Sequence, residues 1–338
     1  MSDLGSFVDR ETVTKTLVGF ALATVLLLLV AKGVGFQRVS DTLAGAELRW
    51  LAAGCLSTLL CLALWGKAWQ VVLRVVGIDV PYRRLVVTYF AATFANYVTP
   101  LGQAGGEPFI AYVLSRDTDA SYEDALASVV TADLLNLLPF FSFSAVGLSV
   151  LLVQADLPSA VKPLAQGLLG MALGIPAIVA VGWRFREGVR AGVLRVAAPI
   201  TARTTRLSLD GVARRIDDLY EAFGRIAADR TALVVAVCFA YAGWVFFALP
   251  LYFSGLTLGF DIAPLLVLFI VPASTLAGLT PAPGGLGGVE VALVALVVAL
   301  TPLGAAQAFA VALVYRVASY WFALLLGGGA AFAVVART

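Results

Sequence analysis

One eight-residue pattern occurs twice in this chain, 183 positions apart, and it restricts the possible folds more than any other feature. The copies span residues 100–107 and 283–290, and both read P-x-G-x-x-G-x-E. The same offset, without a gap, carries Asp133 onto Arg316, and each lies 26 residues beyond the glutamate of its copy. Self-similarity at a fixed spacing indicates duplicated structural units. We therefore expect two related halves.

The regions around the two copies are strongly apolar. Hydrophobic residues make up 61% of the chain and charged residues 13%, with a mean hydropathy of +0.95, whereas soluble domains carry about 25% charged residues. This composition predicts an all-α polytopic membrane protein. The absence of histidine removes the commonest metal ligand and the usual general base. We expect no metal and no cofactor, and we interpret the three cysteines as small buried hydrophobic residues.

Apolar runs predict about six full crossings within a single integral membrane domain, 1–338. Two further apolar pieces are too short to cross, since the piece after Glu107 has only seven apolar residues, about 10 Å of helix against about 30 Å of hydrocarbon. We therefore predict two re-entrant helical hairpins, whose glycine-rich tips border a cavity inside the bilayer. The predicted segments are a first half 16–183 with hairpin 85–115, and a second half 231–338 with hairpin 264–300.

The segment 184–230 differs from the rest of the chain because it is polar and basic. It holds ten arginines and six acidic residues, and Ile216, Leu219 and Phe223 fall on one face of a predicted helix. We expect surface helices that lie along a membrane. Two interpretations remain open: a topology signal alone, or a surface that gathers anionic lipids.

The distribution of basic residues predicts the orientation of the chain. If both hairpins are re-entrant, 18 Lys and Arg residues share one face and four share the other. The positive-inside rule then makes the richer face cytoplasmic and places both termini there, in a multi-pass protein of the cell membrane. The hairpins would open to opposite sides, so the halves form an inverted repeat. Inverted repeats with broken helices are typical of alternating-access transporters.

Four ionisable residues remain at predicted membrane depth: Glu107, Asp133, Glu290 and Arg316. Insertion of each costs about 2.5–3.5 kcal/mol, so we treat them as candidate site residues. One interpretation is structural: the glutamates stabilise the first turn of a half-helix, and Asp133 and Arg316 form a neutralising pair.

The other interpretation is functional. Arg316 would attract a phosphate head group, and backbone N–H groups of the glycine tips would bind it as well. The carboxylates would bind a cation, a proton or a head-group amine. The tip residues concerned are Gly102, Gly105, Gly285 and Gly288.

The two glycine-rich segments also carry a resemblance to a known family. The segment from Asn96 to Glu107 and the segment from Pro281 to Glu290, followed by Tyr315 and Arg316, resemble the transmembrane region of the lysylphosphatidylglycerol synthase / multiple peptide resistance factor family. The resemblance covers roughly residues 18–328. It implies a lipid flippase unit without the aminoacyl-transferring domain. The family often has an arginine in the first-half helix where this chain has Asp133.

The sequence leaves three functions open. The first is a flippase or scramblase-like transporter of a phospholipid or lipid-linked compound, which is not an enzyme and binds no nucleic acid. The second is an intramembrane lipid-modifying transferase, which needs an acidic constellation for a divalent metal. Asp117 and Asp119, and Asp217 and Asp218, lie apart at the predicted surface. The third is a non-transporting accessory membrane protein, which needs no paired hairpins.

Overall fold

The computed structural model describes residues 21, 24, 25, 27–98, 107, 110–115, 120–154, 162–201, 208–279 and 282–335. These residues form helices and connecting turns, without a strand among them, so the expected all-α polytopic fold is confirmed. The helices are α2 (Phe36–Ala44), α3 (Leu48–Val75), α4 (Tyr82–Val98), α6 (Tyr122–Gln154), α7 (Lys162–Arg184), α8 (Arg186–Thr201), α9 (Leu209–Ala228), α10 (Arg230–Thr257), α11 (Pro264–Thr275), α12 (Gly288–Leu300), α13 (Ala305–Arg316) and α14 (Phe322–Val335).

Three short segments interrupt the second half. They are the 3₁₀ turns η2 (Leu276–Leu279) and η3 (Pro283–Gly285), which separate α11 from α12, and the π-helical η4 (Val317–Trp321), which joins α13 to α14. Among the described residues, five segments are long and apolar enough to cross a membrane: Leu48–Val75, Tyr122–Gly147, Arg230–Thr257, Pro283–Leu300 and Ala305–Val334. The fourth of these contains η3, so its continuous α-helix is α12 alone.

The helix boundaries follow the offset of the sequence repeat. α3 begins at Leu48 and α10 at Arg230, 182 positions apart, and α4 and α11 begin at the same separation. α6 begins at Tyr122, and α13 begins 183 positions later at Ala305. The unbroken α6 thus corresponds to the whole of α13, η4 and α14. The orientation of the two halves in a membrane stays a prediction.

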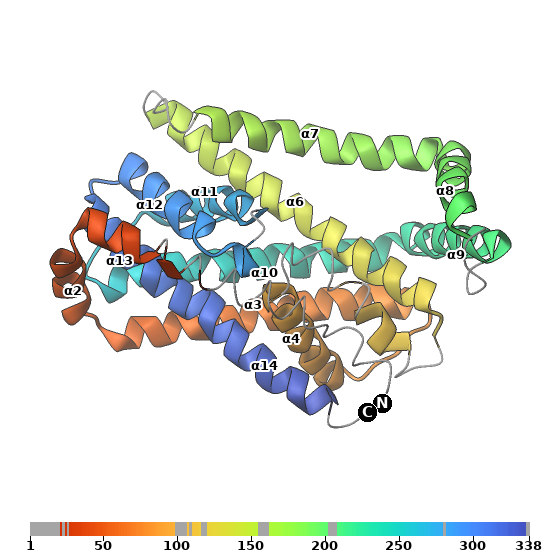
Figure 1. Ribbon diagram of the computed structural model, residues 1–338, viewed down its shortest axis with the longest axis horizontal. Helices are drawn as coiled ribbons and strands as arrows, with labels where there is room; N and C mark the ends of the chain where they lie inside the picture. Colours follow the sequence, from red (N-terminus) through yellow and green to blue (C-terminus); the bar gives the residue numbers. More distant parts are fainter. Residues whose placement is uncertain are drawn as a thin grey trace.

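The two halves contact each other in two ways. Their equivalent helices α3 and α10 pack together, and a short helix of each half packs on a helix of the other half. α3 and α10 lie against each other along the middle of the molecule (Figure 1). Around them, α4 of the first half packs on α14 of the second, and α11 of the second half packs on α6 of the first. Each short limb thus contacts the long helix of the opposite half. The two halves form one interlocked bundle.

Glycines allow close approach at both exchanged contacts. A Cβ atom on Gly147 of α6 would lie 2.3 Å from Cβ of Phe269 on α11. A Cβ atom on Gly327 of α14 would lie 2.5 Å from the carbonyl oxygen of Phe90 and 2.8 Å from Cβ of Phe94, both on α4. Small residues serve helix packing in membranes because they let backbones approach. Both contacts therefore depend on the missing side chain.

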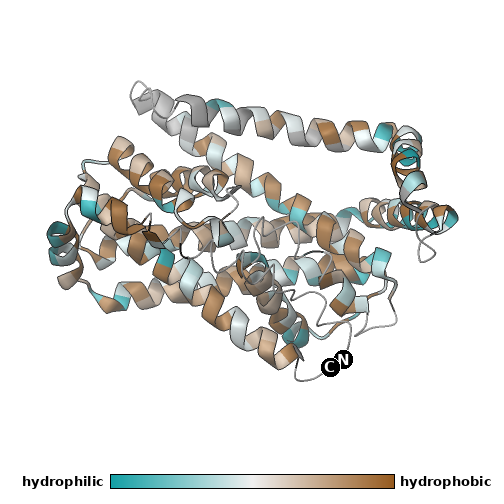
Figure 2. Ribbon diagram, viewed as in Figure 1, coloured by the Kyte–Doolittle hydropathy of each residue, from teal (hydrophilic) through white to brown (hydrophobic). Residues whose placement is uncertain are grey.

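The predicted basic segment 184–230 folds into α8 and α9, at the opposite end of the molecule from α2 and α13 (Figure 1). The Ser208 hydroxyl caps α9 by accepting the Gly211 N–H at 3.1 Å. Hydrophilic residues gather along these two helices (Figure 2). Arg215 pairs with Glu123 of α6 at 3.5 Å, and Arg225 pairs with Asp124. These pairs connect α9 to the first turn of α6, so part of the basic charge is neutralised within the protein.

Substitution of Gly327 by alanine tests the exchanged packing of α14 on α4. The added methyl group collides with backbone, so we expect a loss of about 1–3 kcal/mol and a lower midpoint in thermal unfolding of the purified protein. Gly329→Ala is the matched control, because a Cβ atom there has nothing within 4 Å. Equal midpoints for the two variants would contradict the described contact.

The predicted re-entrant hairpins are tested by cysteine labelling in cells with a membrane-impermeant reagent, in a cysteine-free background. We expect Pro302→Cys to react from outside and Arg116→Cys only from the cytoplasm, because neither short limb spans the hydrocarbon. Pro302 lies between α12 and α13, and Arg116 lies outside the described residues. Reaction of both from the same side would exclude the inverted arrangement.

Candidate functional site

The second glycine-rich copy forms a sharp break between two short helices. α11 has 12 residues and α12 has 13, which correspond to about 18 Å and 20 Å of rise. Neither equals the roughly 30 Å of a bilayer core. The two helices pack against each other. Two short helices thus pack together on either side of the break, and the re-entrant hairpin over 264–300 stays a prediction.

The break depends on glycine at particular positions. Gly284, Gly285 and Gly287 have φ angles of 56°, 64° and 86°, in the left-handed region that side chains rarely adopt. A Cβ atom on Gly285 would lie 2.5 Å from Cα of Gly278, and one on Gly284 would lie 2.1 Å from Cε2 of Tyr320. The turn therefore needs glycine for its backbone angles and for close packing.

Glu290 lies in the first turn of α12 and is buried, with 1% of its surface exposed. Its Oε2 accepts a hydrogen bond of 2.7 Å from the backbone N–H of Gly287, the N-cap residue. A glutamate at the third helical position commonly bonds back to the N-cap N–H. One carboxylate oxygen of Glu290 thus fixes the end of the turn.

Arg316 approaches the same turn from the last residue of α13. Its Nε–H donates to Oε1 of Glu290 at 2.7 Å, and its Nη2 donates to the carbonyl oxygen of Gly284 at 2.9 Å. Its guanidinium carbon lies 4.2 Å from the centre of the Tyr320 ring, within cation–π range. The residue is 7% exposed. The guanidinium is therefore enclosed by a carboxylate, a carbonyl and an aromatic ring.

One of the two interpretations of the sequence, a pair between Asp133 and Arg316, was wrong. Oδ1 of Asp133 accepts a hydrogen bond of 3.2 Å from the indole N–H of Trp69 on α3, whereas Arg316 pairs with Glu290 of its own half. The carboxylate of Glu290 reaches the guanidinium because both flank one turn. In the described part of the chain, neither Glu107 nor Asp133 has a Lys or Arg partner. Glu107 is partly buried.

The predicted glycines divide into two groups. Gly102 and Gly105 lie outside the described residues. Gly285 lies in the turn, next to Gly284, whose carbonyl binds Arg316, and Gly288 is the first residue of α12. The structure thus brings together the second-half members of the predicted site, Gly285, Gly288, Glu290 and Arg316.

Tyr320 is a site residue that sequence reasoning missed. Its ring lies 4.9 Å from the ring of Tyr97, and its hydroxyl donates to the Tyr97 carbonyl oxygen at 3.3 Å. Tyr97 lies in the last turn of α4, just before the first glycine-rich copy. Tyr320 therefore connects the turn of the second half to the end of α4 in the first. A possible signal was its position one turn after Arg316.

The chemistry of this site is that of a buried guanidinium. Arginine presents a planar fork of donors that matches carboxylate and phosphate oxygens. The described residues contain no group of three His, Cys, Asp or Glu side chains that could hold a metal ion. The arrangement is suited to bind an oxyanion.

The fold and this site define a polytopic helical membrane protein with a broken helix and a buried arginine in its interior. The chain belongs to the family of the lysylphosphatidylglycerol synthase TM region, whose family model matches residues 16–327.

Three relatives illustrate the similarity. The chain is 24% identical to a UPF0104 membrane protein of Pyrococcus horikoshii, over 91% of this chain and 93% of the relative. It is 26% identical to a UPF0104 membrane protein of Methanothermobacter thermautotrophicus, over 94% and 93%. It is also 27% identical to Glycosyltransferase AglD of Haloferax volcanii, over 90% of this chain and 52% of that protein.

A pair of double variants tests the partner of Arg316. Arg316→Met leaves the buried carboxylate of Glu290 without its cation, so we expect a loss of about 3–5 kcal/mol in stability. Adding Glu290→Gln removes that charge and keeps an oxygen for the Gly287 N–H, so most of the stability should return. Adding Asp133→Asn instead should restore nothing. Thermal unfolding of the purified proteins measures the stability of both double variants. Recovery with Asp133→Asn would overturn the assignment of Glu290 as the partner of Arg316.

Proposed function

We propose that this protein moves a phospholipid or a lipid-linked compound across the membrane, as a flippase or scramblase-like transporter. One observation carries the proposal: a buried arginine is held against a glycine turn between two short helices, at the contact between the two halves. Transporters with internal repeats place their substrate sites at such broken helices, near the repeat interface. Membership of the family supports a role with membrane lipids.

Arg316 is the proposed ligand of a head-group phosphate. A phosphate oxygen accepts the same charge-assisted hydrogen bonds that Glu290 and the Gly284 carbonyl accept in the described state. Because Arg316 is 7% exposed, a head group reaches its guanidinium only when the turn or Tyr320 moves. Exchange of Glu290 for phosphate would then open the contact. Binding of the substrate and a change in the shape of the site would occur together.

Tyr320 gives that change a path to the other half. It contacts Gly284 of the turn, carries the Arg316 guanidinium on its ring and bonds to Tyr97 of α4. Movement of the turn therefore alters a contact with the first half directly. We propose that this contact is made and broken as the two halves alternate.

Several further assignments belong to the same proposal. The termini lie in the cytoplasm of a cell-membrane protein, and segment 184–230 faces anionic lipids there. The first-half candidates Gly102, Gly105, Glu107 and Asp133 stay part of the proposal, and the two carboxylates among them are assigned the cation or proton coupling. This coupling is assigned to the first half because Glu290 is occupied by Arg316 and the Gly287 N–H.

A second candidate is a lipid-modifying transferase, and one observation favours it. A relative that shares most of this chain is named a glycosyltransferase, although the chain covers about half of that protein. A sugar-carrying lipid would fit both candidates, as the transported compound in one and as a reactant in the other. The chemical state of the lipid after the assay separates them.

Transbilayer movement of labelled phospholipids and polyprenyl-phosphate lipids in vesicles with purified protein tests the main proposal. We expect movement with the lipid chemically unchanged by mass spectrometry. Arg316→Gln combined with Glu290→Gln, the double variant expected to stay folded, should abolish it, and Arg316→Lys should retain a part because an ammonium lacks the planar fork. Arg49→Gln, at an exposed ion pair, is the control and should transport normally.

Two results would contradict the proposal. Normal transport by the folded double variant would remove the role of the arginine. A chemically altered lipid would favour the transferase.

A further inference from the structure

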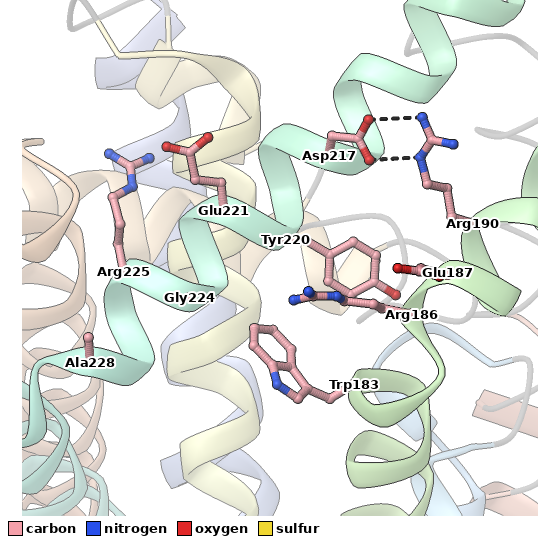
Figure 3. A pocket seen from close by; sticks show the side chains of 10 residues that line it. All are labelled: Trp183, Arg186, Glu187, Arg190, Asp217, Tyr220, Glu221, Gly224, Arg225 and Ala228. Carbon is pink, nitrogen blue, oxygen red and sulfur yellow. Dashed lines mark hydrogen bonds and ion pairs between the residues drawn. The ribbon is translucent and has the colours of Figure 1, made fainter.

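A second candidate binding site lies far along the chain from Arg316, between α7, α8 and α9. It is an open groove of about 950 Å³. Figure 3 shows side chains of α9 along one side and side chains from the end of α7 and the start of α8 along the other. Its lining includes two aromatic and three charged side chains: Trp183, Tyr220, Arg186, Glu187 and Glu221.

Some charges at this groove are already paired. Arg190 binds Asp217 through two hydrogen bonds of 2.8 and 3.0 Å, and these bonds lower the pKa of Asp217, so this pair stays ionised at neutral pH. Arg225 pairs with Asp124 outside the groove. Among the described residues, Arg186, Glu187 and Glu221 form no ion pair. One cation and two carboxylates are therefore free to bind a ligand.

Two aromatic rings lie among these free charges. Trp183 and Tyr220 meet edge to face, with ring centres 6.0 Å apart and an angle of 61°. Aromatic faces attract ammonium groups, most strongly where carboxylates add to the attraction. The rings with Glu187 suit an ammonium group, and Arg186 suits a phosphate next to it, whereas the Glu221 carboxylate points away from the rings toward Arg225 (Figure 3). A ligand with both groups matches the rings, Glu187 and Arg186.

The position of the groove indicates where such a ligand comes from. Val189, Val193 and Val196 lie along one face of α8 and are 43%, 44% and 69% exposed. At 100° per residue, Arg186 falls at the border of this apolar face. A helix with exposed valines on one side and charges on the next is typical of a membrane interface. Phospholipid head groups lie at that boundary, with their acyl chains on the apolar side.

We propose that this groove binds the head group of a zwitterionic aminophospholipid, with the ammonium between Trp183, Tyr220 and Glu187 and the phosphate on Arg186. The site is separate from Arg316 and does not depend on transport. It also differs from a simple anionic-lipid surface, because the free charge in the groove is net negative and selects for an amine.

Lipid binding to the full chain, measured by native mass spectrometry, tests the site. The probes are dioleoyl phosphatidylethanolamine, dioleoyl phosphatidylglycerol and water-soluble glycerophosphoethanolamine. We expect the wild type to bind phosphatidylethanolamine at least fivefold more tightly than phosphatidylglycerol. Glu187→Gln should weaken phosphatidylethanolamine binding about fivefold and spare phosphatidylglycerol. Asp218→Asn, on α9 and also exposed, should change neither.

A second pair of variants tests the phosphate position. Arg186→Gln should weaken both phospholipids, and Arg195→Gln, also exposed on α8, should weaken neither. Equal binding of the two lipids by the wild type, or equal effects of Glu187→Gln and Asp218→Asn, would overturn the proposal. Glycerophosphoethanolamine binding as tightly as the lipid would overturn the membrane source. Arg316→Gln combined with Glu290→Gln should leave this binding intact, so a failed transport assay does not decide it.

Discussion

The interaction between Arg316 and Glu290 determines the form of the second half. Removing two charges from water is costly, and a buried pair is tolerated only when its remaining hydrogen bonds are satisfied. Here the second carboxylate oxygen accepts the Gly287 N–H and the guanidinium also donates to the Gly284 carbonyl. These bonds use backbone groups that the interruption of the helix leaves unpaired. The ion pair and the glycine turn therefore stabilise each other.

Two features of the fold, the glycine break and the equivalent helix starts, could be predicted from the sequence. The matched glycines predicted a break, and the structure places three left-handed residues there. The fixed offset predicted equivalent helices, and the starts of α3 and α10, α4 and α11, and α6 and α13 agree with it to within one residue. Both features are local, since glycine conformation and helix length depend on a few neighbouring residues.

Side-chain partners were harder to predict because they depend on packing between distant segments. Asp133 and Arg316 occupy equivalent positions, and opposite charge suggested a pair. In the structure, Asp133 instead accepts a hydrogen bond from Trp69, and Arg316 donates one to Glu290. Tyr320 was missed because its importance comes from Tyr97, 223 residues earlier in the chain. The groove at α9 needed the path of α7 and α8, which periodicity alone does not give.

The exchanged packing of the short limbs has a consequence for biosynthesis. α4 packs against Gly327 of α14, and Phe94 of α4 precedes Gly327 by 233 residues. At about 5–20 residues per second, α4 is made on the order of ten seconds or more before its partner exists. During that interval its contact face needs a temporary cover, from lipid, from earlier helices or from an insertion factor. A helix that is synthesised late thus completes the burial of a much earlier one, so this part of the protein cannot assemble in the order in which it is made.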